Sequence, residues 1–232
     1  FIGEELAAAT WAGRVYLFGI ADNKFIERWM VTVGAPVRGD LTVIESAGEK
    51  TILVPTESGT LLALNSSTGD ERWRFEAAAP LISAAASDSE RIFIADKKGS
   101  LYALTFGGEL IWTRQIAGGA WYAQPLTKGG HIFQGDDSGT YSAYDVAKGK
   151  ELWRAQLDGG IRGRGAAIGG SIAVATAGGS LYLLDAKNGV VRDRTSVGEA
   201  VLSSPHLVGE MLFIGTRPGA VHSFTVKGVK DF

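Results

Sequence analysis

Glycine recurs along this chain at a constant step of 40 residues, within the motifs TESG, DKKG, DDSG, TAGG and TRPG. The glycines of this series are Gly59, Gly99, Gly139, Gly179 and Gly219. A sixth copy, TWAGRVYLF at 10–18, aligns with TESGTLLAL at 56–64. A fixed period of this size is the signature of a repeat architecture, in which each unit packs against its neighbours. The chain is therefore an array of similar units.

Each unit is predicted to form four short strands. In the third unit the runs fall at 80–86, 91–96, 100–105 and 109–116, with β-branched or aromatic residues inside and turn residues between them. A glycine at one place in each hairpin suits a turn that needs a positive φ. No run with helical periodicity interrupts the pattern. The sequence predicts an all-β chain, a β-propeller of four-stranded antiparallel blades with about 40 residues per repeat.

We expect six blades in a single domain, residues 1–232. The approximate repeats are 1–34, 35–78, 79–118, 119–158, 159–198 and 199–232. The first unit begins at its second strand, which gives 23 strands in all. The missing inner strand comes either from residues 1–3 or from residues outside this sequence. A parent of seven or eight blades stays open if the chain is a fragment.

A large aromatic side chain recurs once per unit, four residues after the glycine of the second hairpin. The residues in this slot are Trp29, Trp73, Trp112, Trp153 and Phe232, whereas the fifth unit has Asp193. A flat ring at one place per blade is suited to packing between neighbouring blades. We expect a structural role for these rings and the weakest contact of this kind at the fifth blade.

The motif Gly-x-Leu-Tyr-Ala-Leu, followed by Asp or Asn, then Gly and a Trp four residues later, resembles the PQQ-like repeat. This family includes the quinoprotein alcohol dehydrogenases, the BamB-type scaffolds of outer-membrane barrel assembly and sensor domains of some bacterial kinases. The resemblance covers nearly the whole chain and implies the propeller fold. Six copies depart from the eight blades of the familiar quinoproteins and of BamB.

Enzyme activity is not expected. The resemblance to quinoproteins implies PQQ with calcium, a catalytic aspartate and a vicinal disulfide, and a chain with no cysteine cannot form that disulfide. Asp136, Asp137 and Asp145 fall in turns, where Asp satisfies its own backbone. The three histidines lie in different strands without metal-ligand spacing. We therefore expect no catalytic residue, no cofactor, no PQQ and no metal site.

Composition limits the partners. A net charge of −2 gives no global basic field, so nucleic acid is not expected. The chain has no apolar run long enough to insert into a membrane. The resemblance to BamB-type proteins implies an extracytoplasmic location in a bacterium, in the periplasm or at the cell surface, rather than the cytoplasm.

A candidate binding site follows from aligning the start of each repeat. One slot holds Arg38, Ile82, Tyr122, Arg162 and Leu202, and the slot two residues later holds Asp40, Ala84, Gln124, Arg164 and Ser204. Residues two apart on a strand share a face. We expect a cationic pocket near the propeller axis that recognises an anionic or peptide group, formed by Arg38, Asp40, Trp121, Tyr122, Gln124, Arg162 and Arg164. The alternative is that these arginines pair with Asp40 or other acids and only close the channel.

The functional prediction is a non-catalytic, BamB-like binding scaffold for protein or peptide partners. Two alternatives stay open. One is a ligand-sensing domain of a larger membrane-tethered receptor or kinase, which a transmembrane segment in the full-length gene would reveal. The other is a propeller that binds a small molecule or a glycan, which quenching of tryptophan fluorescence by added ligand would reveal.

Overall fold

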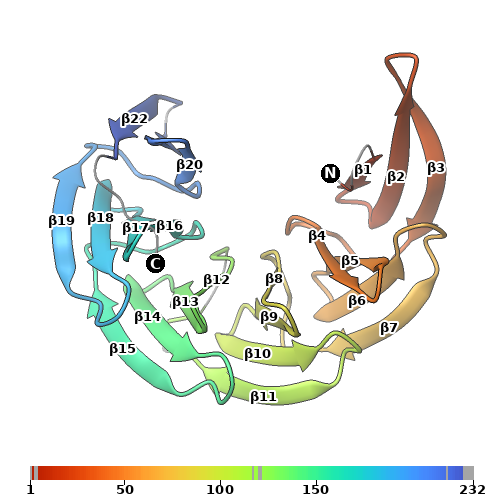
Figure 1. Ribbon diagram of the computed structural model, residues 1–232, viewed down its shortest axis with the longest axis horizontal. Coiled ribbons are helices and arrows are strands. Elements are labelled where there is room, and N and C mark those ends of the chain that lie inside the picture. The colour runs from red at the N-terminus through yellow and green to blue at the C-terminus, as the bar shows by residue number, and fades with distance from the viewer. Residues whose placement is uncertain (1, 3–4, 117, 120–121, 218, 227–232) are drawn as a thin grey trace. The chain divides into compact units, whose positions relative to one another are not determined.

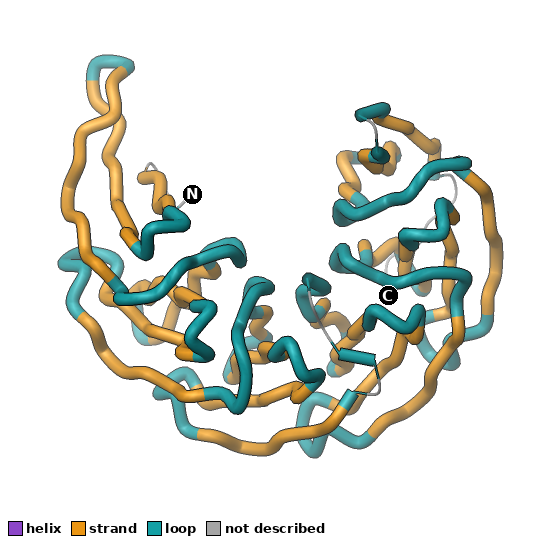
Figure 2. The backbone as a smooth tube through the Cα atoms, turned by 180° about the vertical axis from the view of Figure 1, so that it is seen from behind, coloured by secondary structure: helices purple, strands orange, loops and turns teal. Residues whose placement is uncertain are grey.

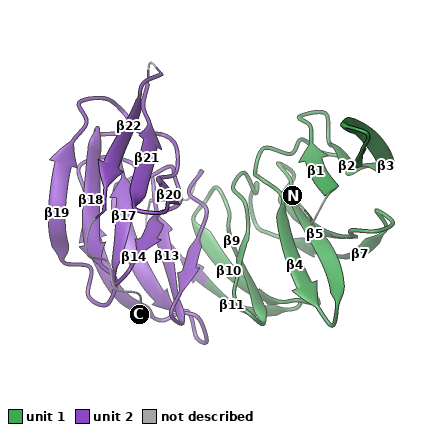
Figure 3. Cartoon of the chain, turned by 45° about the horizontal axis from the view of Figure 1, so that its top comes forward, with its two compact units in different colours: residues 1–113 green, residues 114–232 purple. Residues whose placement is uncertain are grey.

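The computed structural model describes residues 2, 5–116, 118–119, 122–217 and 219–226. Within these residues the chain forms strands and loops and no helix (Figure 2). The chain divides into two compact units, residues 1–113 and 114–232 (Figure 3). The predicted all-β class is confirmed.

Unit 1 contains two complete antiparallel sheets and most of a third (Figure 1). The first sheet has three strands, β1 (Glu5–Ala9), β2 (Arg14–Ala21) and β3 (Lys24–Thr32). The second has four, β4 (Thr42–Ser46), β5 (Glu49–Pro55), β6 (Thr60–Asn65) and β7 (Glu71–Glu76). The third comprises β8 (Ala86–Ser87), β9 (Arg91–Ala95), β10 (Ser100–Thr105) and β11 (Leu110–Gln115), and β11 extends two residues beyond Thr113 into unit 2.

Unit 2 contains three further antiparallel sheets. The first comprises β12 (Leu126–Lys128), β13 (His131–Gly135), β14 (Thr140–Asp145) and β15 (Glu151–Gln156). The next comprises β16 (Ala166–Ile168), β17 (Ser171–Ala175), β18 (Ser180–Asp185) and β19 (Val191–Ser196). The last has β20 (His206–Val208), β21 (Met211–Gly215) and β22 (Val221–Thr225). The described residues thus form six sheets, one per predicted repeat. The expected twenty-third strand falls in residues 227–232, outside the described residues.

The turn between the second and third strands of each unit explains the repeated glycine. Gly139 has a φ of 87° and donates its amide to the Asp136 carbonyl. A Cβ at Gly139 would lie 2.9 Å from the Leu157 carbonyl oxygen, so only glycine fits. The Asp136 carboxylate is fully buried and accepts the amides of Ser138 and Thr140 at 2.9 Å. The other four glycines of the series also have positive φ, between 82° and 133°.

The innermost strands are shorter than predicted. The prediction of a strand over 80–86 is wrong, because β8 covers only Ala86–Ser87. Leu81 is buried, but its amide donates to the Thr56 carbonyl in the preceding sheet's turn instead of pairing with β9. Ile161 bonds to Asp136 and Val201 to Thr176 in the same way. These segments are therefore loops that link a sheet to the one before it.

The apolar core lies between neighbouring sheets within each unit. In unit 1, Val15 and Leu17 of β2 cluster with Ile52 and Val54 of β5. In unit 2, residues of β13 and β14 cluster with residues of β17 and β18. Each sheet thus buries its face against the next one, as stacked repeats require.

The repeated tryptophans lie at these contacts. The Trp73 Nε1 donates to the Phe106 carbonyl at 2.9 Å, and the Trp153 Nε1 donates to the Ala186 carbonyl at 3.1 Å. Trp29 makes the same bond to Ser66 at 3.0 Å. Trp112 is also buried, but its ring contact with Phe93, at 6.1 Å between centroids, lies within its own sheet. Phe232 lies outside the described residues.

Candidate functional site

The predicted site residues lie on the loops that lead into the innermost strands, not on the strands themselves. Arg38 and Asp40 precede β4 in unit 1. In unit 2, Tyr122 and Gln124 precede β12, and Arg162 and Arg164 precede β16. Trp121 lies outside the described residues. The structure therefore presents two groups, one in each unit, and each is described by itself.

Arg162 is the centre of the group in unit 2. Its guanidinium carbon lies 5.7 Å from the centroid of the Tyr122 ring, a cation–π arrangement. Its Nε lies 3.4 Å from Oδ1 of Asp137, which belongs to the turn between β13 and β14. This is ion-pair range, but neither atom has a hydrogen-bond partner among the described residues. The pair is held by charge and keeps unused hydrogen-bonding capacity.

The Asp137 carboxyl responds to this environment. Burial raises its pKa above the ordinary value, and the neighbouring Asp136 carboxylate adds to the rise. The positive charge of Arg162 acts in the opposite direction and lowers the pKa of Asp137. Arg162 is thus the group that favours the ionised form of this partly buried acid.

Arg164 extends from the same loop in a more exposed position. Its backbone amide donates to the Ser204 hydroxyl at 2.9 Å, which fixes the loop against the following repeat. The glycines on either side leave no room for a side chain. A Cβ at Gly163 would lie 2.4 Å from the Ser203 carbonyl oxygen, and one at Gly165 would lie 2.3 Å from the Tyr141 hydroxyl. The segment is therefore tightly packed, and the Arg164 side chain is presented to solvent.

Arg38 has a comparable setting in unit 1. It pairs with Glu57 in the turn between β5 and β6. Its guanidinium carbon lies 3.7 Å from the centroid of the Trp11 ring, which is 60% exposed. Asp40 is two residues later in the chain, and the acid that pairs with Arg38 is Glu57. In each unit an arginine thus sits beside both an aromatic ring and a carboxylate.

Sequence reasoning missed three members of these groups, Trp11, Glu57 and Asp137. All three occupy one place in the repeat, directly after the Thr or Asp that anchors the turn between the second and third strands. The repeat alignment contained this slot, but its residue types differ from unit to unit. These three residues lie close to Arg38 and Arg162 only because the loops that carry the arginines fold back over the turns.

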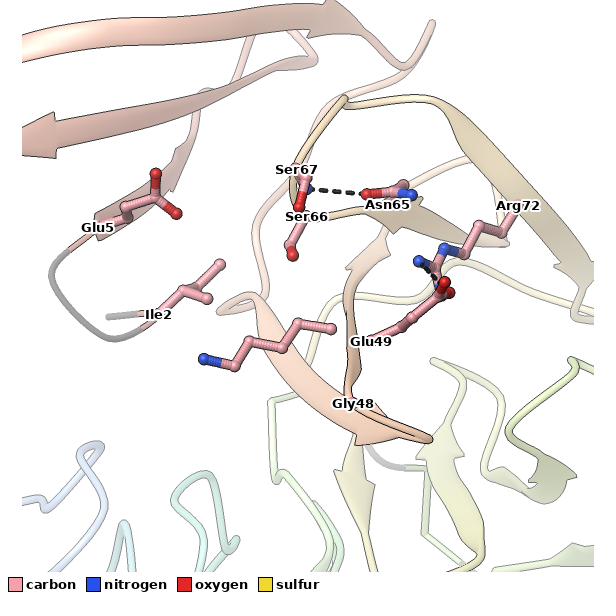
Figure 4. A pocket seen from close by; sticks show the side chains of 9 residues that line it. Ile2, Glu5, Gly48, Glu49, Asn65, Ser66, Ser67 and Arg72 are labelled. Carbon is pink, nitrogen blue, oxygen red and sulfur yellow. Dashed lines mark hydrogen bonds and ion pairs between the residues drawn. The ribbon is translucent and has the colours of Figure 1, made fainter.

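A second polar site in unit 1 lies beside the turn between β6 and β7. It is a cavity of about 370 Å³. Figure 4 shows Glu49 and Arg72 pointing toward one another, with a 2.8 Å ion pair between them, and Asn65 accepting the Ser67 amide at 2.8 Å. Glu49 and Arg72 are thus engaged with each other, and Lys50 also lines the cavity.

The described residues contain no cluster of three or more His, Cys, Asp or Glu side chains arranged to hold a metal ion. In the same part of the chain, no helix is long and apolar enough to cross a membrane.

Comparison with known proteins identifies the family. A family model described as "Outer membrane protein assembly factor BamB" matches residues 12–115 and 58–211. A curated protein of that name from Burkholderia pseudomallei is 30% identical over 196 residues, which cover 77% of this chain and 50% of the relative. The chain thus spans about half the length of the curated relatives it matches.

Solved structures show the same fold. BamB from Moraxella catarrhalis matches with a TM-score of 0.81 and 18% identity, over 99% of this chain and 72% of that one. Sqt1 from Saccharomyces cerevisiae matches with a TM-score of 0.84 and 16% identity, over 97% and 69%. At these identities the likeness concerns the fold alone, and it confirms the propeller class with a blade count consistent with six. The predicted resemblance to PQQ-like repeats is confirmed, and the chain belongs to the family described as outer membrane protein assembly factor BamB.

Proposed function

We propose that this chain is a non-catalytic, extracytoplasmic scaffold that binds a protein or peptide partner during outer membrane protein assembly. The family description and the curated relatives support this role, because all of them carry the name of an assembly factor. The same names favour a scaffold over the ligand-sensing domain and the small-molecule or glycan binder. Since the chain spans about half of each relative, the partner itself belongs to the proposal.

The loop of unit 2 that carries Arg162 and Arg164 is the proposed contact surface. The observation that carries this assignment is the position of Arg162, whose side chain is 39% exposed while its buried Nε faces Asp137 Oδ1 at 3.4 Å without a hydrogen bond among the described residues. A partner carboxylate can accept from the guanidinium in a bidentate geometry. The Tyr122 ring beside it adds the aromatic area that is typical of interface hot spots. Arg164 supplies a second, solvent-exposed guanidinium on the same loop.

Binding of wild-type and substituted chains to a solubilised outer-membrane fraction tests this surface. We expect the Arg162→Ala, Arg164→Ala double variant to bind at least about tenfold more weakly, since truncation at an interface hot spot costs roughly 2 kcal/mol or more. Arg154→Ala is the matched control, because Arg154 is an exposed arginine of β15 that pairs with Glu151 at 2.7 Å. Equal binding by wild type and the double variant would exclude the loop that carries Arg162 and Arg164 as the contact surface.

A further inference from the structure

Tryptophan joins neighbouring sheets by a repeated contact with two parts. The indole N–H donates to the first carbonyl of the next sheet's outer hairpin turn, as Trp73 does to Phe106 and Trp153 does to Ala186. The ring covers the glycine of that same turn. A Cβ at Gly108 would lie 2.5 Å from the Trp73 ring, and one at Gly189 would lie 2.4 Å from the Trp153 ring. The space between two sheets at this level is thus shaped for an indole.

The fifth sheet has no aromatic side chain at the position that tryptophan occupies in the first four sheets. Asp193 takes the tryptophan place on β19 and is exposed to solvent. A cavity of about 420 Å³ lies there between the fifth and sixth sheets, both in unit 2. The residues that line it include Leu181, Tyr182, Asp193, Leu212, Phe224 and Val226. The weak contact that the sequence predicted at Asp193 corresponds to this cavity.

The cavity is lined by the residue that corresponds to the hydrogen-bond acceptor of the missing ring. Trp73 and Trp153 each reach the carbonyl 33 residues later, and the same offset from Asp193 leads to Val226, which lines the cavity. The Val226 amide is already bonded to the Glu210 carbonyl at 2.8 Å, as Ala186 is to Gly170 in the preceding sheet. Val226 is thus held in the same way as Ala186 is in the occupied site. Leu181 and Leu212 are buried, and Leu183 packs against the same cluster, so these leucines give the cavity an apolar floor.

We propose that this cavity binds an indole ring, with the ring N–H donating to the Val226 carbonyl and the ring plane packed between β18 and β22. The volume is ample, since an apolar protein cavity of about 150 Å³ already holds benzene. The carboxylate of Asp193 at the rim disfavours an indole that carries an acidic group. The ring can be the side chain of a tryptophan in a partner polypeptide or a free indole compound. The lining of this cavity does not include Arg38, Arg162 or Arg164.

Calorimetric titration with indole and with N-acetyl-tryptophanamide tests the site. We expect both to bind the wild type, and we expect Asp193→Trp to lose binding by about tenfold or more, because its own ring fills the cavity. Asp193→Ala leaves the cavity open and should retain binding, and indole-3-acetate should bind Asp193→Ala more tightly than the wild type. A higher melting temperature of Asp193→Trp would show that the introduced ring is accommodated.

Trp153→Ala provides a positive control, because it opens the corresponding space before Gly189, and indole should restore part of its lost thermal stability. If Trp153→Ala binds indole and the wild type does not, the proposal is wrong. Equal binding by wild type, Asp193→Trp and Asp193→Phe would also overturn it. Tighter binding of a tryptophan-containing peptide than of indole would identify a polypeptide source for the ring, and the reverse order would identify a small indole compound.

Discussion

Asp158 shows how one residue can hold a loop to the following sheet. It lies between β15 and β16, and its two carboxylate oxygens accept from Thr176 at 2.7 Å, from Ser180 at 2.5 Å and from Arg194 at 2.6 Å. Burial opposes ionisation of this group. The hydrogen bonds from Ser180 and Thr176 and the charge of Arg194 outweigh the burial and hold the pKa of Asp158 below its ordinary value. The ionised carboxylate therefore stabilises the fold.

We expect Asp158→Asn to lower the free energy of unfolding at pH 7 by about 1 kcal/mol, allowing for solvent screening at this partly exposed site. Because the pKa is lower in the folded state, the stabilisation is complete above the ordinary value of 3.8 and is lost as the pH falls through the lowered value. Urea unfolding at pH 7 and at pH 3 measures this. The gap between wild type and variant should shrink at pH 3. Asp70→Asn, at an exposed turn aspartate, should show a smaller gap at pH 7.

At the residue scale, the sequence predicted which residue type a position requires better than which residues contact one another. The glycine of each turn could be predicted because its backbone conformation depends on a few adjacent residues. The partner of Arg38 could not, because Asp40 is near in sequence while Glu57 is brought near by folding. The aromatic neighbour of Arg38, Trp11, comes from a different sheet. Contacts of this kind follow from loop paths, which period and alternation do not encode.

At the element scale, the outer hairpin turn and the tryptophan of the preceding sheet form one structural unit. The turn must contain glycine for two reasons. Gly189 has a φ of 72°, which costs other residues backbone strain, and the Trp153 ring occupies the space where a Cβ would be. The two requirements can be separated by experiment, because other glycines of the chain meet only the first of them.

We expect Gly189→Ala to destabilise the protein by about 2–4 kcal/mol, with a share of about 1 kcal/mol from the positive φ and the remainder from displacing the Trp153 ring. Gly198→Ala is the matched control, since Gly198 has a φ of 76° and no other atom lies within 4 Å of the place a Cβ would take. It should lose only the share due to backbone strain. Thermal and urea unfolding of both variants give the comparison. Equal losses would mean that the ring contact contributes nothing.

The strands themselves were predicted to different degrees. In the third repeat the prediction of 100–105 coincides with β10, because turn residues on both sides limit the run. The inner strand was predicted too long, because the buried Leu81 and Ala85 resemble a strand in composition. A run of apolar residues predicts burial but not the type of backbone structure. A buried loop is as acceptable as a strand when its amides donate to the neighbouring sheet.

At the scale of the whole molecule, the repeat explains why the fold class could be predicted and the site could not. The 40-residue period determines the number and type of the sheets, since every unit repeats the same local rules. The residues of the proposed contact surface occupy slots where the units differ, such as Tyr122 and Arg162. A repeat alignment identifies these slots but not what each side chain contacts.

In an array of repeats, the free energy of unfolding is expected to be a sum of local contributions. Within each unit the sheets pack against their neighbours, so the total should be close to such a sum. The ring contacts of Trp73 lie within unit 1 and those of Trp153 within unit 2, with separate partners. Substitutions at sites that share no partner are usually additive within about 0.5 kcal/mol.

We expect Trp73→Ala and Trp153→Ala each to cost about 3 kcal/mol or more, through loss of a large ring and an interlocking hydrogen bond. The double variant should lose the sum of the two in equilibrium urea unfolding. Trp11→Ala is the control, because Trp11 is 60% exposed and its loss should cost less than about 1 kcal/mol. A double variant that departs from the sum by more than about 1 kcal/mol would show coupling beyond nearest neighbours. Additivity would instead mean that a substitution at one sheet contact, Asp193 included, can be made without weakening the others.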